Sequence, residues 1–155
     1  MCTWSQVEAD SREFAEAGRR LLIGSDGTAI GFLATSRGGK GHIAPVCPVF
    51  SREDIYLSAS ATSPKVRDLR ANPSYALHAF LGSNDEEFQI AGLAVEVSDP
   101  AERTAVHEAI PFAAFDRKDP IFRLGIERVL WVFWERVGQP DTRAVRRRWP
   151  SHGTT

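Results

Sequence analysis

Cysteine, metal-binding motifs and long apolar runs are scarce or missing in this sequence, and each shortage excludes a class of protein. The 155 residues contain two cysteines, Cys2 and Cys47, which form no C-x-x-C motif. We therefore predict two reduced thiols, with no disulfide and no metal site. No stretch approaches the roughly 20 apolar residues of a membrane span, and the first residues show no apolar signal-peptide core. These shortages favour a cytoplasmic protein without membrane contact.

An excess of charge of one sign is also missing. Lysine and arginine together number 19 and the acidic residues 20, so the net charge is −1. This balance argues against binding of nucleic acid by the whole surface. Hydrophobic residues make up 43% and charged residues 25%, which is typical of a single globular domain of this length. Every basic residue except Lys40, Lys65 and Lys118 is an arginine, so each lysine stands out.

The pattern along the chain divides this one domain into three parts. Residues 1–23 have apolar side chains at helical spacing behind Thr3 or Ser5, which predicts an N-terminal helix. Residues 29–137 alternate strand-like segments with turns, which predicts a barrel. Residues 138–155 form a basic C-terminal tail, typical of a solvated or salt-bridged end.

Six strands are predicted within the barrel region. A glycine-rich turn over 37–41 joins the first two into a hairpin, and Gly92 interrupts the fifth, which predicts a bend or bulge there. Short helices are predicted over 63–72 and from Asp99-Pro100 to about residue 110. The strands are 29–36, 42–50, 55–59, 75–81, 88–97 and 129–135. Hairpin-linked strands with short helices between them favour an antiparallel barrel over repeated βαβ units.

The stretch from 63 to 73 carries the most specific motif, S-x-K-x-x-x-L-x-x-N-P. Ser63 and Pro64 are typical of a helix start, and Asn72-Pro73 of a helix end. Free N–H groups at a helix N-terminus suit a phosphate, and Lys65 in the first turn opposes the helix dipole unless an anion is held there. The alternative is a plain capped helix with a solvent-facing lysine.

Other features occur around this motif in a fixed order. A hairpin ending in Gly41-His42-Ile43-Ala44-Pro45-Val46 and the strand 55–59 precede it, and the strand 90–97 follows it. Together they resemble the pyridoxamine 5'-phosphate oxidase-like family, the FMN-binding split β-barrels. The resemblance implies a mainly β fold, a six-stranded antiparallel split β-barrel with accessory helices. It also implies a homodimer with a flavin in each of two clefts at the subunit interface.

The resemblance further implies which residues would hold FMN. The helix start would hold the phosphate, two strand ends would approach the ring and ribityl chain, and a tryptophan would reach the flavin of the other subunit. The residues are Ile43, Ala44, Pro45, Val46, Ser58, Ala59, Ser63, Lys65 and Trp134. From the residues alone, strand, core or dimer packing explains the apolar and small members of this set equally well.

The expected function is that of an FMN-dependent oxidoreductase acting on a small molecule of unknown identity. The flavin ring would carry the hydride chemistry, so no acid or base residue is named. Authentic pyridoxamine phosphate oxidases differ at His42, Pro64 and Glu87 and have a C-terminal R-x-H, so vitamin B6 synthesis is not predicted. The alternatives are a deazaflavin coenzyme-dependent reductase of the same fold, or a non-enzymatic flavin or haem binder with His42 or His78 as the axial ligand.

Overall fold

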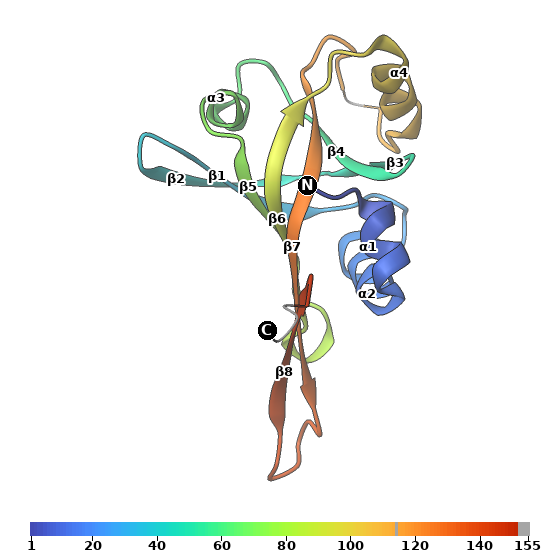
Figure 1. Ribbon diagram of the computed structural model, residues 1–155, viewed down its shortest axis with the longest axis vertical. Coiled ribbons are helices and arrows are strands. Elements are labelled where there is room, and N and C mark those ends of the chain that lie inside the picture. Colours follow the sequence, from blue (N-terminus) through green and yellow to red (C-terminus); the bar gives the residue numbers. More distant parts are fainter. Residues whose placement is uncertain (114, 152–155) are drawn as a thin grey trace.

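The computed structural model of the chain describes residues 1–113 and 115–151. Within them, one antiparallel sheet curls into an open half-barrel, and four α-helices and one short 3-10 helix lie around it (Figure 1). The strands are β1 (Gly31–Arg37), β2 (Lys40–Val46), β3 (Val49–Ser51), β4 (Asp54–Ser58), β5 (Ser74–Ala79), β6 (Glu87–Glu96), β7 (Ile121–Glu135) and β8 (Arg143–Trp149). The helices are α1 (Trp4–Asp10), α2 (Arg12–Leu22), α3 (Pro64–Ala71), η1 (Ser83–Asp85) and α4 (Pro100–Ala109).

Strand β7 is the longest strand and pairs with three others, β4, β6 and β8. The strand order is β2-β1-β5-β6-β7-β4-β3, and β8 pairs with β7 as well. The first part of β7 pairs with β4 and its last part with β8, while β6 runs along its other side. The last part of β7 and β8 therefore form an arm that extends from the body (Figure 1).

The mainly β, antiparallel fold is confirmed, but the prediction of six strands is wrong because the sheet has eight among the described residues. One missed strand is β3, which the sequence pattern merged with β2. Pro48 lies between them and has no N–H to donate to a ladder, so the strand breaks there. The other is β8, which lies within the predicted basic tail. Its arginines occur on both faces and hide the alternation of a half-buried strand.

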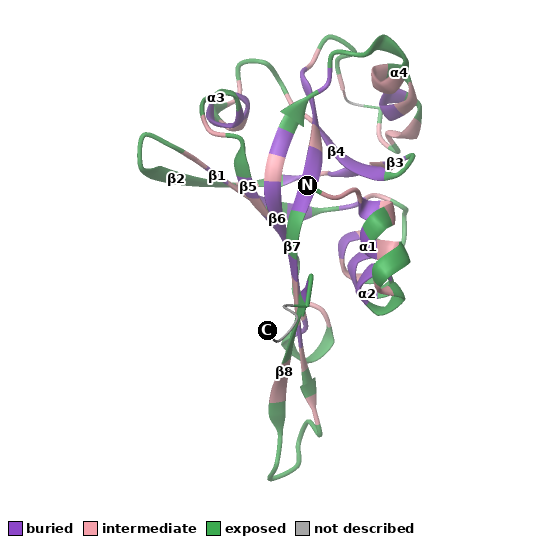
Figure 2. Cartoon of the chain, in the orientation of Figure 1, coloured by how far each residue is buried: buried purple, intermediate pink, exposed green. Residues whose placement is uncertain are grey.

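The N-terminal segment forms two helices where the sequence pattern predicts one. Thr3 begins α1 with a capping box, in which its hydroxyl accepts from the Gln6 N–H at 3.2 Å and its own N–H donates to Gln6 Oε1 at 2.7 Å. Ser11 has extended backbone angles and separates α1 from α2. Both helices turn their buried side toward the sheet (Figure 2). The ring of Trp4 packs edge-on against Phe88 of β6, with centroids 6.3 Å apart.

Gly92 bends β6 as its place in the strand pattern predicts. The register between β6 and β7 shifts between Ala91 and Gly92, which confirms the irregularity. A Cβ atom at Gly92 would lie 2.0 Å from the carbonyl oxygen of Gly125 on β7. Only glycine therefore lets the two backbones approach this closely, and the close approach curls the sheet over its core.

Candidate functional site

A cleft of about 450 Å³ opens between the end of β2, the end of β4 and the start of α3. Five of the nine residues predicted from the sequence to hold FMN line this cleft. They come from two strand ends and a helix that lie far apart in the sequence. The loop after α4 contributes Phe112. The lining residues are Ile30, Pro45, Val46, Cys47, Leu57, Ser58, Ala59, Lys65 and Phe112.

The other four selected residues lie outside this lining. Ile43 and Ala44 precede the cleft on β2, and the Ile43 side chain is 75% exposed. Ser63 stands immediately before α3. Trp134 lies on the arm, beside a smaller hollow of about 190 Å³ that Asn84 and other residues line. Within one chain, the structure does not bring Trp134 to the cleft.

Sequence reasoning missed four lining residues. Cys47 and Leu57 directly adjoin the selected Val46 and Ser58, so the strand ends themselves could have indicated them. Ile30 and Phe112 come from segments that carry no motif. Their place in the lining depends on how β1 and the loop after α4 fold against the sheet.

Two serine hydroxyls, one in the cleft lining and one just before α3, are buried without a hydrogen-bond partner among the described residues. They are Ser58 Oγ, at the end of β4, and Ser63 Oγ, at the N-cap position of α3. The Ser63 backbone is in the extended N-cap conformation, yet its side chain makes no capping bond. Buried hydroxyls are nearly always paired, so these two are candidates to bind a ligand.

The start of α3 adds cationic and N–H groups to these hydroxyls. Pro64 is the first helical residue and has no N–H, whereas the next N–H groups of the first turn have no partner within the helix. The Lys65 side chain lines the cleft and forms no salt bridge with a described residue. Hydroxyls, N–H groups and an ammonium group together suit a phosphate-bearing ligand.

A buried carboxylate lies further along the same helix. Asp68 is 0% exposed and accepts hydrogen bonds from Thr35 Oγ1 at 2.8 Å, His42 Nδ1 at 2.8 Å and Arg37 Nε at 3.2 Å. Burial alone would raise the pKa of this carboxyl group. The hydrogen bonds from Thr35 and His42, with the charges of His42 and Arg37, outweigh burial and hold the pKa below its usual value. Asp68 is therefore ionised at neutral pH.

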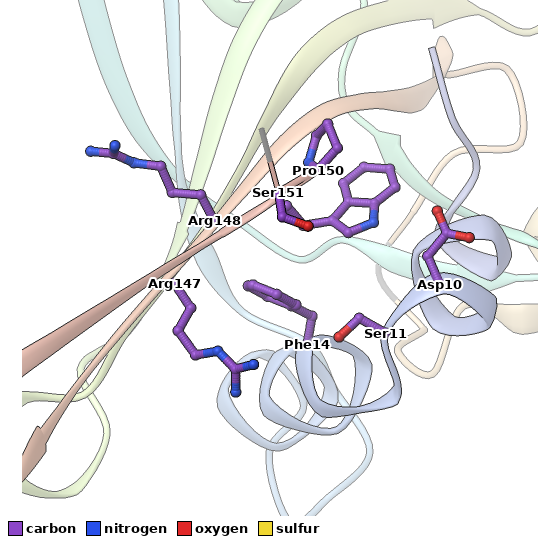
Figure 3. A pocket seen from close by; sticks show the side chains of 8 residues that line it. Asp10, Ser11, Phe14, Arg147, Arg148, Pro150 and Ser151 are labelled. Atoms are coloured by element: carbon purple, nitrogen blue, oxygen red, sulfur yellow. The ribbon is translucent and has the colours of Figure 1, made fainter. Parts of the chain in front are cut away.

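A second large cavity, of about 490 Å³, lies where α1 and α2 meet the end of β8 (Figure 3). Of its charged residues, Arg147 packs the arm against α2. The Arg147 guanidinium binds Glu13 and lies 5.9 Å from the ring centre of Phe14 and 5.8 Å from that of Trp131. None of the residues selected from the sequence lines this cavity.

No described helix is long and apolar enough to cross a membrane. No three side chains of the kinds that bind metal converge within residues 1–113 and 115–151.

Comparison with known proteins identifies the fold. No protein-family model and no curated protein matches the chain. A candidate pyridoxamine 5'-phosphate oxidase from Listeria innocua matches in structure with a TM-score of 0.61 and 16% identity, over 76% of this chain and 94% of its own. The chain thus has the split-barrel fold of the pyridoxamine 5'-phosphate oxidase-like proteins.

Two further solved structures with this fold bind different groups. An FAD-binding protein from Mesorhizobium loti matches with a TM-score of 0.52 and 21% identity, over 64% of this chain and 80% of its own. A haem-binding protein from Mycobacterium smegmatis matches with a TM-score of 0.58 and 20% identity, over 84% of this chain but 57% of its own. At these identities the fold is common to all, and the ligand has to be argued from the site itself.

Proposed function

We propose that this chain is a homodimeric FMN-binding oxidoreductase that acts on a small molecule. The observation that carries the proposal is the convergence, in one cleft, of five selected residues with Lys65 among them, beside two buried hydroxyls that lack a partner. A buried hydroxyl costs roughly 1–3 kcal/mol when it is left unpaired. A ligand with a phosphate and a polyhydroxylated chain would satisfy both.

The residues of the cleft fit the parts of FMN. Lys65, the Ser63 hydroxyl and the first N–H groups of α3 would hold the phosphate. The Ser58 hydroxyl would bind the ribityl chain, while Pro45 and Val46 would line one edge of the ring. When bound, the flavin would supply hydride transfer, and these residues would orient it and exclude water.

An exposed apolar face supports the homodimer. Ile43, Phe80 and Phe32 are 75%, 45% and 42% exposed on strands β2 and β1 and at the end of β5. Phe32 lies opposite Pro45 of β2 and His78 of β5, and its ring centre is 4.9 Å from that of Phe80. Apolar side chains gathered on one face of a sheet typically mark a protein interface.

A second copy of the chain is the occupant we propose for this face. Pro45 belongs both to the face and to the lining of the cleft, so a copy seated there would cover the cleft. It would also allow the partner's Trp134, 44% exposed on its arm, to reach the flavin that its own chain does not approach.

Titration of the purified protein with FMN, followed by quenching of flavin fluorescence, tests the proposal. A deazaflavin coenzyme and haem are titrated in parallel. Tight binding of FMN supports the proposal. Tight binding of the deazaflavin coenzyme alone would indicate a deazaflavin-dependent reductase, and tight binding of haem alone would indicate a haem-binding protein. If none of the three binds, the cleft is not a cofactor site.

The variant Lys65→Ala tests the phosphate contact within that experiment. We expect its affinity for FMN to fall by about 10-fold or more, since a charge-assisted hydrogen bond contributes about 1.5–3 kcal/mol. Lys118→Ala is the matched control, because Lys118 is exposed and does not line the cleft. Equal losses in the two variants would contradict the assignment of the phosphate to α3.

A further inference from the structure

The cavity where α1 and α2 meet the end of β8 shares no lining residue with the cleft at α3. Its volume of about 490 Å³ is within the range of small-molecule sites. Asp10, Ser11 and Phe14 face it from the junction of the two helices, whereas Arg148 points away from it (Figure 3). A ligand can therefore bind in this cavity without touching the cleft.

One buried indole at this cavity lacks a hydrogen-bond partner among the described residues. Trp149 lines the cavity and is 7% exposed. The indole N–H of Trp4 donates to Glu8 at 2.7 Å. That of Trp131 donates to Glu86 at 2.8 Å, but Trp149 Nε1 makes no such bond within residues 1–113 and 115–151. Because buried indole N–H groups usually have a partner, this donor is available to a ligand.

The start of α2 offers further donors at the same cavity. Ser11 is the N-cap residue and has extended backbone angles, yet its side chain makes no capping bond. The first N–H groups of this 11-residue helix have no partner within the helix. At the start of α1, by contrast, the Thr3 hydroxyl accepts from the Gln6 N–H. An anionic oxygen bound at α2 would therefore take the place of the missing cap.

Arg147 adds a positive charge beside these donors. Its Nη1 binds Glu13, and a guanidinium group has five N–H donors, so others remain for a ligand. The guanidinium carbon lies 5.9 Å from the ring centre of Phe14. Asp10 lines the cavity as well, and Glu13 lies in the first turn of α2. Because these two carboxylates repel negative charge, the site suits an anion with one charge better than a dianion.

We propose that this cavity is a second small-molecule site, which binds an aromatic carboxylate. The carboxylate accepts hydrogen bonds from Trp149 Nε1 and from the start of α2, and the ring of the ligand packs against Phe14. Aromatic rings attract one another beyond the effect of burial, which favours an aromatic ligand over an aliphatic one. The bound ligand joins α2 to β8. The inference does not depend on the proposed FMN function.

Benzoate is the first probe, and the indole N–H signals in proton–nitrogen NMR spectra are the readout. The four tryptophans give four such signals, and Trp149→Phe identifies that of Trp149. Benzoate is expected to move this signal with a Kd of about 1 mM, the affinity of a ligand of this size. The signals of Trp4 and Trp131, whose N–H groups are already paired, are expected to stay. A Trp149 signal that has not moved at about 10 mM benzoate overturns the inference.

Related probes test the chemical class of the ligand. Benzyl alcohol keeps the ring and lacks the charge, and acetate keeps the carboxylate and lacks the ring. Each is expected to bind at least about 10-fold more weakly than benzoate. 2-Naphthoate is expected to bind more tightly, because it buries more apolar surface in the cavity. Equal affinities for benzoate and acetate overturn the inference, because the ring would then contribute nothing.

Two variants test the named contacts, with affinity measured from the amide signals of residues 11–14. Trp149→Phe keeps a ring and loses the N–H, so benzoate affinity is expected to fall about 10-fold. Ser11→Ala is expected to lower it about threefold. Ser98→Ala is the matched control and is expected to bind as wild type does, because Ser98 is exposed and lies outside the cavity. Wild-type affinity in both cavity variants overturns the assigned contacts.

The position of the other indole signals shows whether Trp149→Phe is folded. If it is not folded, Ser11→Ala and the wild-type titration decide the inference. Saturation with FMN is expected to leave benzoate affinity unchanged, because the two sites share no lining residue. Displacement of benzoate by FMN overturns the claim of a second site.

Discussion

Helices α3 and α4 both begin with a polar N-cap residue and a proline, but the side chains at the two helix starts have different partners. Each has a capping residue followed by proline at the first helical position. In α4 the Asp99 carboxylate accepts from the Glu102 N–H at 2.7 Å, and the Glu102 side chain binds Tyr56 at 2.9 Å and Arg123 at 3.1 Å. The start of α4 is thus satisfied by the protein itself.

The start of α3 is not satisfied in this way. The Ser63 hydroxyl is buried without a partner among the described residues, and the first turn of α3 contains the cationic Lys65, whereas the first turn of α4 contains the acidic Glu102. This helix is fixed at its middle, through Asp68, and is open at its N-terminus. The comparison shows that the protein's own side chains satisfy the start of α4 and leave the Ser63 hydroxyl at the start of α3 without a partner among the described residues, which is why we propose that α3 binds an anion there.

Removal of the middle anchor of α3 is expected to have the largest effect on stability. Asp68→Ala leaves Thr35 and His42 without their acceptor and should lower the free energy of unfolding by about 3 kcal/mol. Urea unfolding followed by circular dichroism measures it. A change below about 1 kcal/mol would show that α3 is held by its apolar contacts alone.

The dependence of stability on acidic pH tests the contribution of the ionised Asp68 carboxylate. The pKa of Asp68 lies below its unfolded value of about 3.9, so its contribution is complete above that pH and is lost as pH falls toward the lower folded value. We therefore expect the unfolding free energy of wild type to fall as the pH drops below about 4, and that of Asp68→Asn to fall less steeply over the same range. Parallel profiles for the two proteins would contradict this account.

The cap of α4 is expected to matter for stability and not for binding. Asp99→Ala should lower the free energy of unfolding by about 1 kcal/mol, the usual cost of a lost N-cap. Its dissociation constant for FMN should equal that of wild type. Chemical unfolding and a flavin titration of the same preparation check both expectations.

The cap position of α3 is expected to show the reverse behaviour, with the smallest effect on stability. Ser63→Ala removes a hydroxyl that has no partner, so the free energy of unfolding should change by less than about 0.5 kcal/mol. FMN affinity should fall about threefold to tenfold, as one hydrogen bond is lost. A stability loss equal to that of Asp99→Ala would mean that Ser63 is an ordinary cap.

The sequence pattern predicted those parts of the fold that local chemistry specifies. The motif over 63–73 predicted the bounds of α3, and the cap at Asp99 predicted the start of α4. The bulge at Gly92 was also predicted, since glycine inside a strand marks close backbone approach. By contrast, β8 was not predicted, because its arginines are exposed on both faces, two of them paired with Glu135 and Glu13, and only Trp149 is buried.

The candidate site was predictable in part for the same reason. Pro45 and Lys65 belong to motifs, and the structure places both in the cleft. The pairing of His42 with Asp68 joins residues 26 apart through the register of β1 with β2, and the lining by Phe112 depends on an irregular loop. Neither leaves a local signal in the sequence.

The most direct test of the central claim compares FMN with riboflavin on the wild-type protein. The two ligands differ only in the phosphate, so the ratio of their dissociation constants isolates what the start of α3 contributes. Binding of FMN at least about 10-fold more tightly than riboflavin is the predicted result. Equal affinities would contradict the claim that this helix start holds an anion.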